Sequence, residues 1–392
     1  MAALNVAIAG CGVAGLACAA LLRGHGARVV IFDKLEAPRP IGSGIILQPV
    51  GLSVLDEIGV GHAMRGLGAP IRRLFGRATP KQTIVLDVDY GALGADAACG
   101  LGVHRGALFQ LLYEAACAAG AEIENGRDVA AATGGRLHFA NGGASARFDL
   151  VIDALGMRSP LSVQARSLLP YGAVWASLTR AGAFSGDALE QRYVAARKMA
   201  GVLPIGRLPG EGRAQTAFFW SLKHDAREAW RAQPFEAWKQ EVLDLWPATA
   251  PLLAQLRSHD DLVFAAYAHR TLRQPLSREC VHVGDSWHCT SPQLGQGANM
   301  ALLDALALSR ALGAQSDLET ALGEYARMRL WHIRLYQLAS FLFTPAYQSD
   351  SAAIAWFRDH VMAPLSRTPP APQILAALVA GQIGAPLAAM RV

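Results

Sequence analysis

Three closely spaced glycines near the start of the chain constrain the fold more than any other feature. They interrupt the apolar run "NVAIAGCGVAGLACAALL", which reads as a strand over residues 5–9, a turn and then a helix. A second apolar strand follows over residues 27–32 and ends at an aspartate. A strand, a helix and a strand in this order predict neighbouring parallel strands, because parallel pairing requires a crossover connection. The chain is therefore expected to be an α/β protein.

The glycine turn is also suited to bind a phosphate group. Backbone amides and the positive end of the following helix can approach a pyrophosphate there, while a carboxylate after the second strand can hold ribose hydroxyls. A tight turn without a ligand is the alternative, but the aspartate and the strand–helix–strand context favour an adenosine dinucleotide, either NAD or FAD. The predicted contacts come from both ends of this unit: Gly10, Gly12, Val13, Ala14, Gly15, Asp33 and Lys34.

A second motif, "VGDSWHCTSPQLGQGANMALLDA" over residues 283–305, distinguishes between these two cofactors. Asp285 follows a strand and can accept hydrogen bonds from the ribityl chain of a flavin. The glycine-rich segment behind it presents bare backbone amides at the start of a new helix, an arrangement that favours negative charge. A reduced flavin carries negative charge at one edge of its ring, which such a helix start can stabilise, whereas the nicotinamide ring of NAD does not require this stabilisation. The motif therefore indicates FAD, and its predicted contacts are Asp285, Gly295, Gln296, Gly297, Ala298 and Asn299.

These motifs resemble those of the class A flavoprotein monooxygenases of the p-hydroxybenzoate hydroxylase type, over about the first 340 residues. The resemblance rests on "GCGVAG" with Asp33, on "HRGALFQLL" and on "GDSWHCTSPQLGQGANMALLDA". It implies that Arg105 contacts the pyrophosphate or ribityl part of FAD and that Pro292 lies beside the reactive ring. It also implies that the loop over residues 42–45, which includes Gly44, lies near the flavin.

The resemblance further implies an FAD-dependent monooxygenase. Such an enzyme inserts one oxygen atom from O2 into an aromatic or flat apolar small molecule through a C4a-hydroperoxyflavin, with NAD(P)H as the reductant. One departure bears on the reductant, because the family's Asp-Gly pair falls on Leu155 and Gly156, with Asp153 upstream of it. For this reason one alternative stays open, a flavoenzyme of the same fold that epoxidises or uses externally reduced flavin. A second alternative, from another class, is a flavin-binding protein with a non-redox role.

Alternating polar and apolar residues indicate a second kind of sheet later in the chain. Stretches such as "KQTIVLDVDY" are typical of antiparallel strands. We therefore expect an FAD-binding parallel-sheet domain with an inserted antiparallel-sheet substrate domain and a C-terminal helical region. The expected ranges are 1–70, 99–169 and 270–317 for the FAD-binding domain, 71–98 and 170–269 for the substrate domain, and 318–392 for the C-terminal helices.

A flavin oxygenase needs a pocket that excludes water and orients its substrate, and apolar aromatic walls meet both needs. His269 and Tyr267 are the predicted catalytic groups, because the strand that carries them runs back towards the flavin domain. For a lone histidine, a structural hydrogen-bonding role is the alternative. Ordinary core packing is the alternative for the aromatic residues of the predicted substrate wall, which are Phe75, Tyr193, Phe219 and Trp220.

The charge and cysteine patterns narrow the choice of partners and compartment. The net charge of +5 is spread over the chain without a basic run, so nucleic acid is not expected as a partner. Six cysteines lack any C-x-x-C spacing, which indicates a reducing, cytoplasmic compartment. No apolar run reaches the length of a membrane span. Asp285 with His288 offers too few ligands for a metal site. Trp356 and Phe357 in the C-terminal region are expected to cover the sheet; a homodimer face and a membrane-surface patch are the alternatives.

Overall fold

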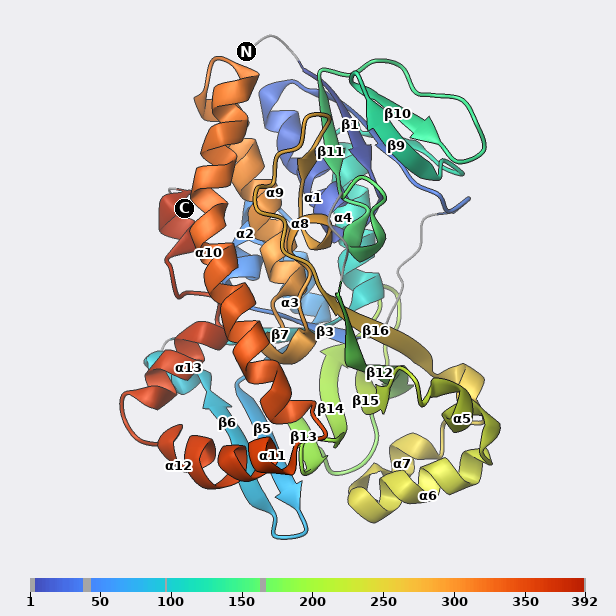
Figure 1. Ribbon diagram of the computed structural model, residues 1–392, viewed down its shortest axis with the longest axis vertical. Coiled ribbons are helices and arrows are strands. Elements are labelled where there is room, and N and C mark those ends of the chain that lie inside the picture. Colours follow the sequence, from blue (N-terminus) through green and yellow to red (C-terminus); the bar gives the residue numbers. More distant parts are fainter. Residues whose placement is uncertain (1–3, 38–43, 96, 163–166, 391–392) are drawn as a thin grey trace.

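The computed structural model describes residues 4–37, 44–95, 97–162 and 167–390, which are organised around two large sheets (Figure 1). A five-stranded sheet lies near one end of the molecule and a seven-stranded sheet near the other. The long helix α10 (Leu318–Tyr347) runs along the molecule and leads to a group of short C-terminal helices. The expected α/β fold, with a parallel sheet, an antiparallel sheet and C-terminal helices, is confirmed.

All neighbouring strands of the five-stranded sheet are parallel, as the glycine-interrupted unit predicts. In the order in which they pair, its strands are β17 (Val281–His282), β11 (Leu150–Asp153), β1 (Asn5–Ala9), β2 (Arg28–Phe32) and β8 (Glu122–Glu124). The helices packed around it are α1 (Val13–Leu22), α4 (Arg105–Ala118) and α9 (Gly297–Ala314). Apolar side chains of these strands and helices form one buried cluster.

Two glycines allow α1 to start directly at the end of β1. Gly10 has a φ of +108°, and a Cβ on it would lie 2.6 Å from the carbonyl oxygen of Ala154. A Cβ on Gly15 would lie 2.1 Å from the carbonyl oxygen of Gly10. Any larger residue at either position would push the helix away from the sheet, so this tight turn requires glycine.

The seven-stranded sheet is antiparallel except for one parallel pair, β5 with β13. In pairing order its strands are β16 (Val263–His269), β12 (Ser167–Thr179), β15 (Gln215–Lys223), β14 (Lys198–Gly206), β13 (Ala188–Val194), β5 (Arg73–Thr79) and β6 (Thr83–Asp89). The last two strands in this order, β5 and the edge strand β6, come from a segment far earlier in the chain than the other five. The expected boundaries of the two domains stay a prediction.

The two faces of this sheet pack against different parts of the protein. Phe218 and Trp220 of β15 join a buried cluster with Trp238 of a helical insert. The insert consists of α5 (Arg227–Ala232), α6 (Phe235–Leu245) and α7 (Ala250–Leu253). Phe219, which lies between the first two residues, points to the opposite face, because alternate side chains of a strand point in opposite directions.

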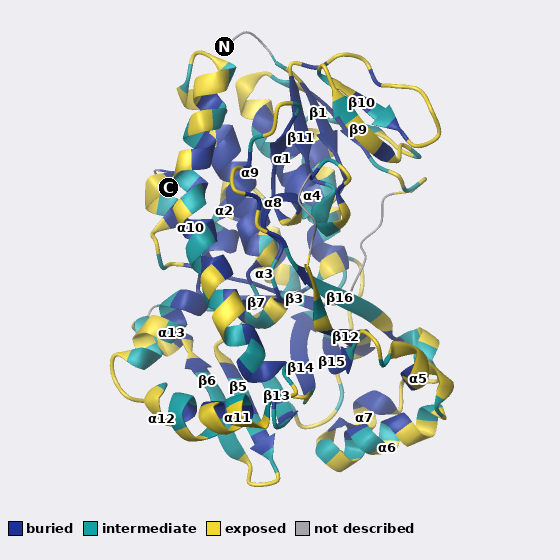
Figure 2. Cartoon of the chain, in the orientation of Figure 1, coloured by how far each residue is buried: buried dark blue, intermediate teal, exposed yellow. Residues whose placement is uncertain are grey.

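Smaller elements complete the fold. Two further sheets are formed by β3 (Gly44–Leu47), β7 (Gly100–His104) and β4 (Ala69–Ile71), and by β9 (Val129–Thr133) with β10 (Arg136–Phe139). The other helices are α2 (Pro49–Ile58), α3 (Gly61–Leu67), α8 (Asp285–His288), α11 (Ala352–Phe357), α12 (Ala363–Leu365), α13 (Ala371–Val379) and α14 (Pro386–Ala389). Figure 2 shows that α9 is largely buried, whereas α10 and α12 expose much of their surfaces. None of the described helices is both long and apolar enough to cross a membrane.

Candidate active site

A cavity of about 690 Å³ lies between the parallel-sheet region, the seven-stranded sheet and the C-terminal helices. Its walls come from the start of α4, the segment that leads into α9, one face of the seven-stranded sheet, and α10, α12 and α13. This volume falls within the range of small-molecule binding sites. Residues predicted to contact a flavin from two distant motifs, Arg105 and Asp285, both line this cavity.

Arg105 and Asp285 bring opposite charges to one end of the cavity. Both side chains are open to the cavity, although protein surrounds them on most sides. Burial lowers the pKa of Arg105, and the negative charge of Asp285 opposes this change. Burial raises the pKa of Asp285, while the charges of His288 and Arg105 oppose that rise. The pair offers a donor and an acceptor to the polar chain of a dinucleotide.

The start of α9 faces the same cavity. A short turn over Pro292–Leu294 leads into Gly295, which has a φ of +62°, and the helix begins at Gly297. Among the described residues, a Cβ on Gly297 would meet only the Oδ1 of Asp285, at 4.0 Å, so none of these residues crowds the start of the helix at this position. The first N–H groups of a helix have no partner within it and favour negative charge. The helix start therefore fits an anionic edge of a ligand, as the sequence predicts.

Two of the predicted cofactor residues use their side chains within the protein instead. The Asn299 amide accepts the backbone N–H of Gln48 at 2.8 Å and donates to the carbonyl oxygen of Gly295 at 2.9 Å. The Gln296 amide donates to the carbonyl oxygen of Val379 at 2.6 Å. Both side chains hold the helix start in place, and the Gln296 Oε1 has no hydrogen-bond partner among the described residues. Contacts of Asn299 and Gln296 with a flavin stay a prediction.

Asp304, within α9, also holds the segment before this helix in place. This fully buried carboxylate accepts hydrogen bonds from the backbone N–H of Gly284 at 2.8 Å, from Arg329 Nε at 2.8 Å and from His288 Nε2 at 2.6 Å. Burial alone would raise the pKa of Asp304, but the charges of His288 and Arg329 lower it. His288 is thus engaged with Asp304. Within the described part of the chain, no three His, Cys, Asp or Glu side chains are grouped so that they could hold a metal ion.

The glycine turn lies open at the end of β1. A Cβ on Gly12 would meet no atom of the described residues within 4 Å, which leaves room for a ligand to approach the first amides of α1. Asp33, at the end of β2, accepts the backbone N–H groups of Cys11 at 2.8 Å and Leu35 at 2.9 Å. Its carboxylate therefore joins the turn to the strand end and lies beside the helix start. The remaining predicted contacts at this end are Gly10, Val13, Ala14, Gly15 and Lys34.

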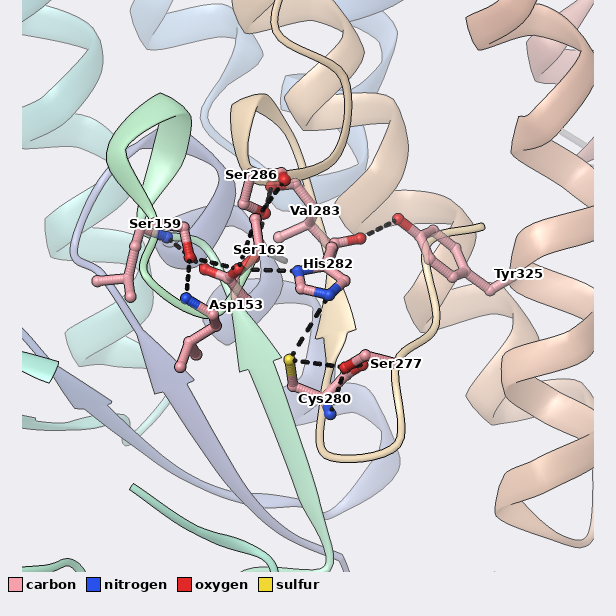
Figure 3. A network of polar contacts seen from close by, with 11 residues as sticks. Asp153, Ser159, Ser162, Ser277, Cys280, His282, Val283, Ser286 and Tyr325 are labelled. Carbon is pink, nitrogen blue, oxygen red and sulfur yellow. Dashed lines mark hydrogen bonds and ion pairs between the residues drawn. The ribbon is translucent and has the colours of Figure 1, made fainter. Parts of the chain in front are cut away.

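Asp153 is turned into the protein interior. It is fully buried at the end of β11 and accepts hydrogen bonds from Ser159 Oγ at 2.6 Å, the backbone N–H of Leu155 at 3.1 Å and His282 Nδ1 at 2.8 Å (Figure 3). Burial alone would lower the pKa of His282, but its hydrogen bonds with Asp153 and Cys280 raise it to about 9. The displaced aspartate is therefore half of a buried ion pair that joins β11 to β17.

The hydrogen-bond network around Asp153 extends to Ser286, the residue that follows Asp285. Ser162 Oγ donates to the carbonyl oxygen of Ser286 at 2.7 Å, and Ser286 Oγ donates to that of Asp153 at 2.7 Å (Figure 3). Ser286 directly follows Asp285 in the chain. The network thus fixes the backbone at Asp285. Met157, in the short turn that follows β11, lines the cavity.

Two of the four residues of the predicted aromatic wall line the cavity, and two do not. Tyr193 and Phe219 line the cavity. Trp220 does not, because it points to the opposite face of its strand and packs against the helical insert. Phe75 also lies outside the lining, where the guanidinium groups of Arg73 and Arg77 stand 4.6 and 5.2 Å from its ring centre. Wall residues that the sequence analysis did not identify include Trp175, Met199 and Leu203.

Of the two predicted catalytic groups, one lines the cavity and the other does not. Tyr267 lines the cavity, and its hydroxyl accepts a hydrogen bond from Trp175 Nε1 at 3.2 Å. Burial raises the pKa of Tyr267 above its ordinary value, so the phenol stays neutral and is suited to donate a hydrogen bond rather than to act as a base. His269 is not part of the lining, and its ring lies 6.3 Å from that of Phe341 on α10. Burial lowers its pKa.

Gln48 was not identified from the sequence, yet its amide lines the cavity beside the helix start. It is fully buried, and its Oε1 accepts a hydrogen bond from the Tyr90 hydroxyl. Its Nε2 has no hydrogen-bond partner among the described residues. A buried donor without a partner is costly, so this amide is available to a ligand. The only signal in the sequence was one polar residue between an apolar strand and Pro49, which opens α2.

Comparison with known proteins decides the cofactor. The family described as FAD binding domain matches residues 3–332. The chain belongs to this family. Gly44, which starts β3, and Ile45 line the cavity, whereas residues 42 and 43 of the predicted 42–45 loop lie outside the described residues. The FAD cofactor and the resemblance to class A flavoprotein monooxygenases are confirmed.

Several characterised proteins are similar over nearly the whole chain. Aurachin C monooxygenase/isomerase from Stigmatella aurantiaca is 26% identical over 383 residues, which is 93% of this chain and 94% of that protein. Phenazine 1,6-dicarboxylic acid hydroxylase from Lysobacter antibioticus is 29% identical over 83% of this chain and 86% of that protein. The tetrameric form of 2-methyl-3-hydroxypyridine-5-carboxylic acid oxygenase has a TM-score of 0.78 at 22% identity, covering 99% of this chain and 98% of that one.

Proposed function

We propose that this protein is an FAD-dependent monooxygenase that adds one oxygen atom of O2 to a flat aromatic molecule, with NAD(P)H as the reductant. One observation supports this most strongly: a single cavity joins the flavin-type contacts of Arg105, Asp285 and the α9 start to an apolar aromatic wall. The names of similar proteins point the same way, because they include a phenazine-dicarboxylate hydroxylase and an FAD-dependent urate hydroxylase from Klebsiella pneumoniae.

The described residues fit FAD in separate places. The open amides at Gly12 suit the pyrophosphate, Asp33 the adenosine ribose, and Arg105 with Asp285 the ribityl chain. The start of α9 and the Gln48 amide suit the ring edge that becomes anionic on reduction. When bound, FAD supplies hydride acceptance from a nicotinamide and activation of O2.

The chain's own residues prepare the space in which the substrate reacts. Trp175, Phe219 and Met199 form an apolar wall that excludes water and leaves a flat ring few positions to occupy. Tyr267 places a neutral hydroxyl in this wall, where it can donate a hydrogen bond to a substrate oxygen or nitrogen. None of these contacts requires a charged substrate.

Rapid mixing of the holoenzyme tests the proposal and separates it from its alternatives. Bleaching of the flavin by NADH or NADPH, followed by substrate-dependent uptake of ¹⁸O from ¹⁸O2 into product, is the expected result. Incorporation of ¹⁸O only after chemical prereduction would favour an externally reduced flavin. Neither bleaching nor incorporation would favour a non-redox role and would contradict the oxygenase.

Two narrower expectations belong to the same proposal: a homodimer and a cytoplasmic location. The dimer is supported by exposed apolar side chains on the C-terminal helices, among them Trp331, Phe341 and Trp356. Six free cysteines, four of them buried, support a reducing compartment. Light scattering of the purified protein tests the first, and a fluorescent fusion expressed in the native host tests the second.

A further inference from the structure

The cavity has a polar end and an apolar end. The polar end lies at Arg105, Asp285 and the α9 start, where the flavin contacts are. The apolar end lies between the sheet edge and the short helices α12 and α13, which pack against β6. We call this end the apolar passage, and its wall is formed by Leu74, Val85, Leu86, Val88, Met362 and Leu375.

Polar groups that border the apolar passage are already bound within the protein. Asp87 pairs with Arg73 through two contacts of 2.8 Å. Ser366 Oγ donates to the carbonyl oxygen of Ala363 at 2.8 Å, and the Gln191 amide donates to a methionine sulfur at 3.2 Å. The apolar passage can therefore contact apolar groups of a ligand, and none of these polar side chains needs a hydrogen bond from that ligand.

The apolar passage opens at the surface of the C-terminal helices. Leu365 of α12 and Ile374 of α13 both line the cavity, yet they are 61% and 52% exposed. Figure 2 shows exposed surface on both helices. An apolar wall that is continuous from the interior to exposed leucine and isoleucine side chains can cover a ligand group that is longer than it is wide.

We propose that the substrate carries a hydrocarbon chain on its aromatic ring, and that this chain lies in the apolar passage with its end between Leu365 and Ile374. The ring then lies against Phe219 and Tyr267, next to the flavin side of the cavity. This inference rests on the proposed function for the position of the ring. The passage itself recognises the chain by burial of apolar surface, whatever reaction follows.

A homologous series of ligands tests the proposal. The holoenzyme is titrated with 2-alkyl-4-hydroxyquinolines that carry methyl to nonyl chains, and binding is read from the flavin absorption spectrum. The dissociation constant is expected to fall by about fourfold for each added methylene, and to level off once the chain extends beyond the opening. Affinity that does not rise with chain length, including no binding by any member, overturns the proposal.

A charge at the opening gives an independent test. Ile374→Glu places a carboxylate beside the end of a long chain, so binding of the nonyl ligand is expected to weaken by about tenfold, while the methyl ligand binds as before. Leu338→Glu on α10 is the matched control, because Leu338 is 55% exposed and does not line the cavity. Equal effects of the two substitutions on the nonyl ligand would overturn the proposal.

The same titration separates this inference from the proposed function. Chain-length-dependent binding without ¹⁸O incorporation would leave the apolar passage standing and contradict the oxygenase. Incorporation of ¹⁸O into short-chain ligands, with no gain in affinity from longer chains, would support the oxygenase and contradict the apolar passage.

Discussion

Replacing His282 with asparagine is expected to remove a pH dependence from the stability of this protein. The imidazole donates through Nδ1 to the buried Asp153 carboxylate at 2.8 Å, and both side chains are almost completely inaccessible to solvent. An asparagine amide can donate from nearly the same position, so His282→Asn keeps a partner for Asp153. What it removes is the titratable proton.

The magnitude follows from the pKa of His282, which rises from 6.5 to about 9 on folding. A change of this size corresponds to about 3 kcal/mol of unfolding free energy, at 1.36 kcal/mol for each pKa unit. Because the pKa is raised in the folded state, this contribution is fully present below pH 6.5 and is lost as the pH rises through 9. The wild type should therefore lose about 3 kcal/mol more than His282→Asn across this interval.

Urea unfolding at a series of pH values, with FAD in excess, measures this difference. His62→Asn is the control, because His62 lies on the exposed surface of α3 and should leave the wild-type pH profile unchanged. If His282→Asn retains the wild-type fall in stability between pH 6.5 and 9, the histidine does not carry the buried charge and the reasoning is wrong.

Three further substitutions test other parts of the site. Asp285→Asn should weaken FAD binding by about tenfold or more, since a charge-assisted acceptor is lost, and flavin fluorescence during titration measures this; unchanged affinity would contradict its assignment to the ribityl chain. Asp304→Asn leaves the buried Arg329 without its counter-charge and should cost about 3–5 kcal/mol in urea unfolding; a loss below about 1 kcal/mol would show that the pair is dispensable. Tyr267→Phe should lower turnover without shifting the pH profile of kcat, because the phenol is neutral; disappearance of a pH limb would identify Tyr267 as the base.

The parts of the fold that depend on local sequence were predictable. The strand–turn–helix over residues 5–22 follows from glycines at positions where a Cβ would collide with backbone, and apolar periodicity places the helix. Asp285 and the helix start could be assigned for the same reason, because an aspartate, a turn and a helix N-terminus are close in the chain. Arg105 depended on the family pattern, since nothing local distinguishes it from a surface arginine.

Side-chain direction and long-range packing account for what could not be predicted. Trp220 and Phe219 are neighbouring aromatic residues, and only the position of the helical insert decides which of them faces the cavity. The hydrogen bond between the Gln48 backbone and Asn299 could not be predicted either, because nothing in the sequence shows that the two residues are neighbours. Asp153 and His282 lie 129 positions apart, so their pairing becomes visible only once the two strands are adjacent.

The hydrogen bond from Gln296 to the carbonyl oxygen of Val379 has a consequence for how such enzymes can diversify. It joins α13 directly to the segment that starts α9. The C-terminal helices therefore complete the wall of the cavity, although the residues proposed to contact the flavin belong to other elements. Mutations confined to this C-terminal segment can therefore redefine which molecules are admitted while the oxygen-activating machinery stays intact. Directed evolution of new selectivity would begin most profitably there, with libraries that leave Val379 in place.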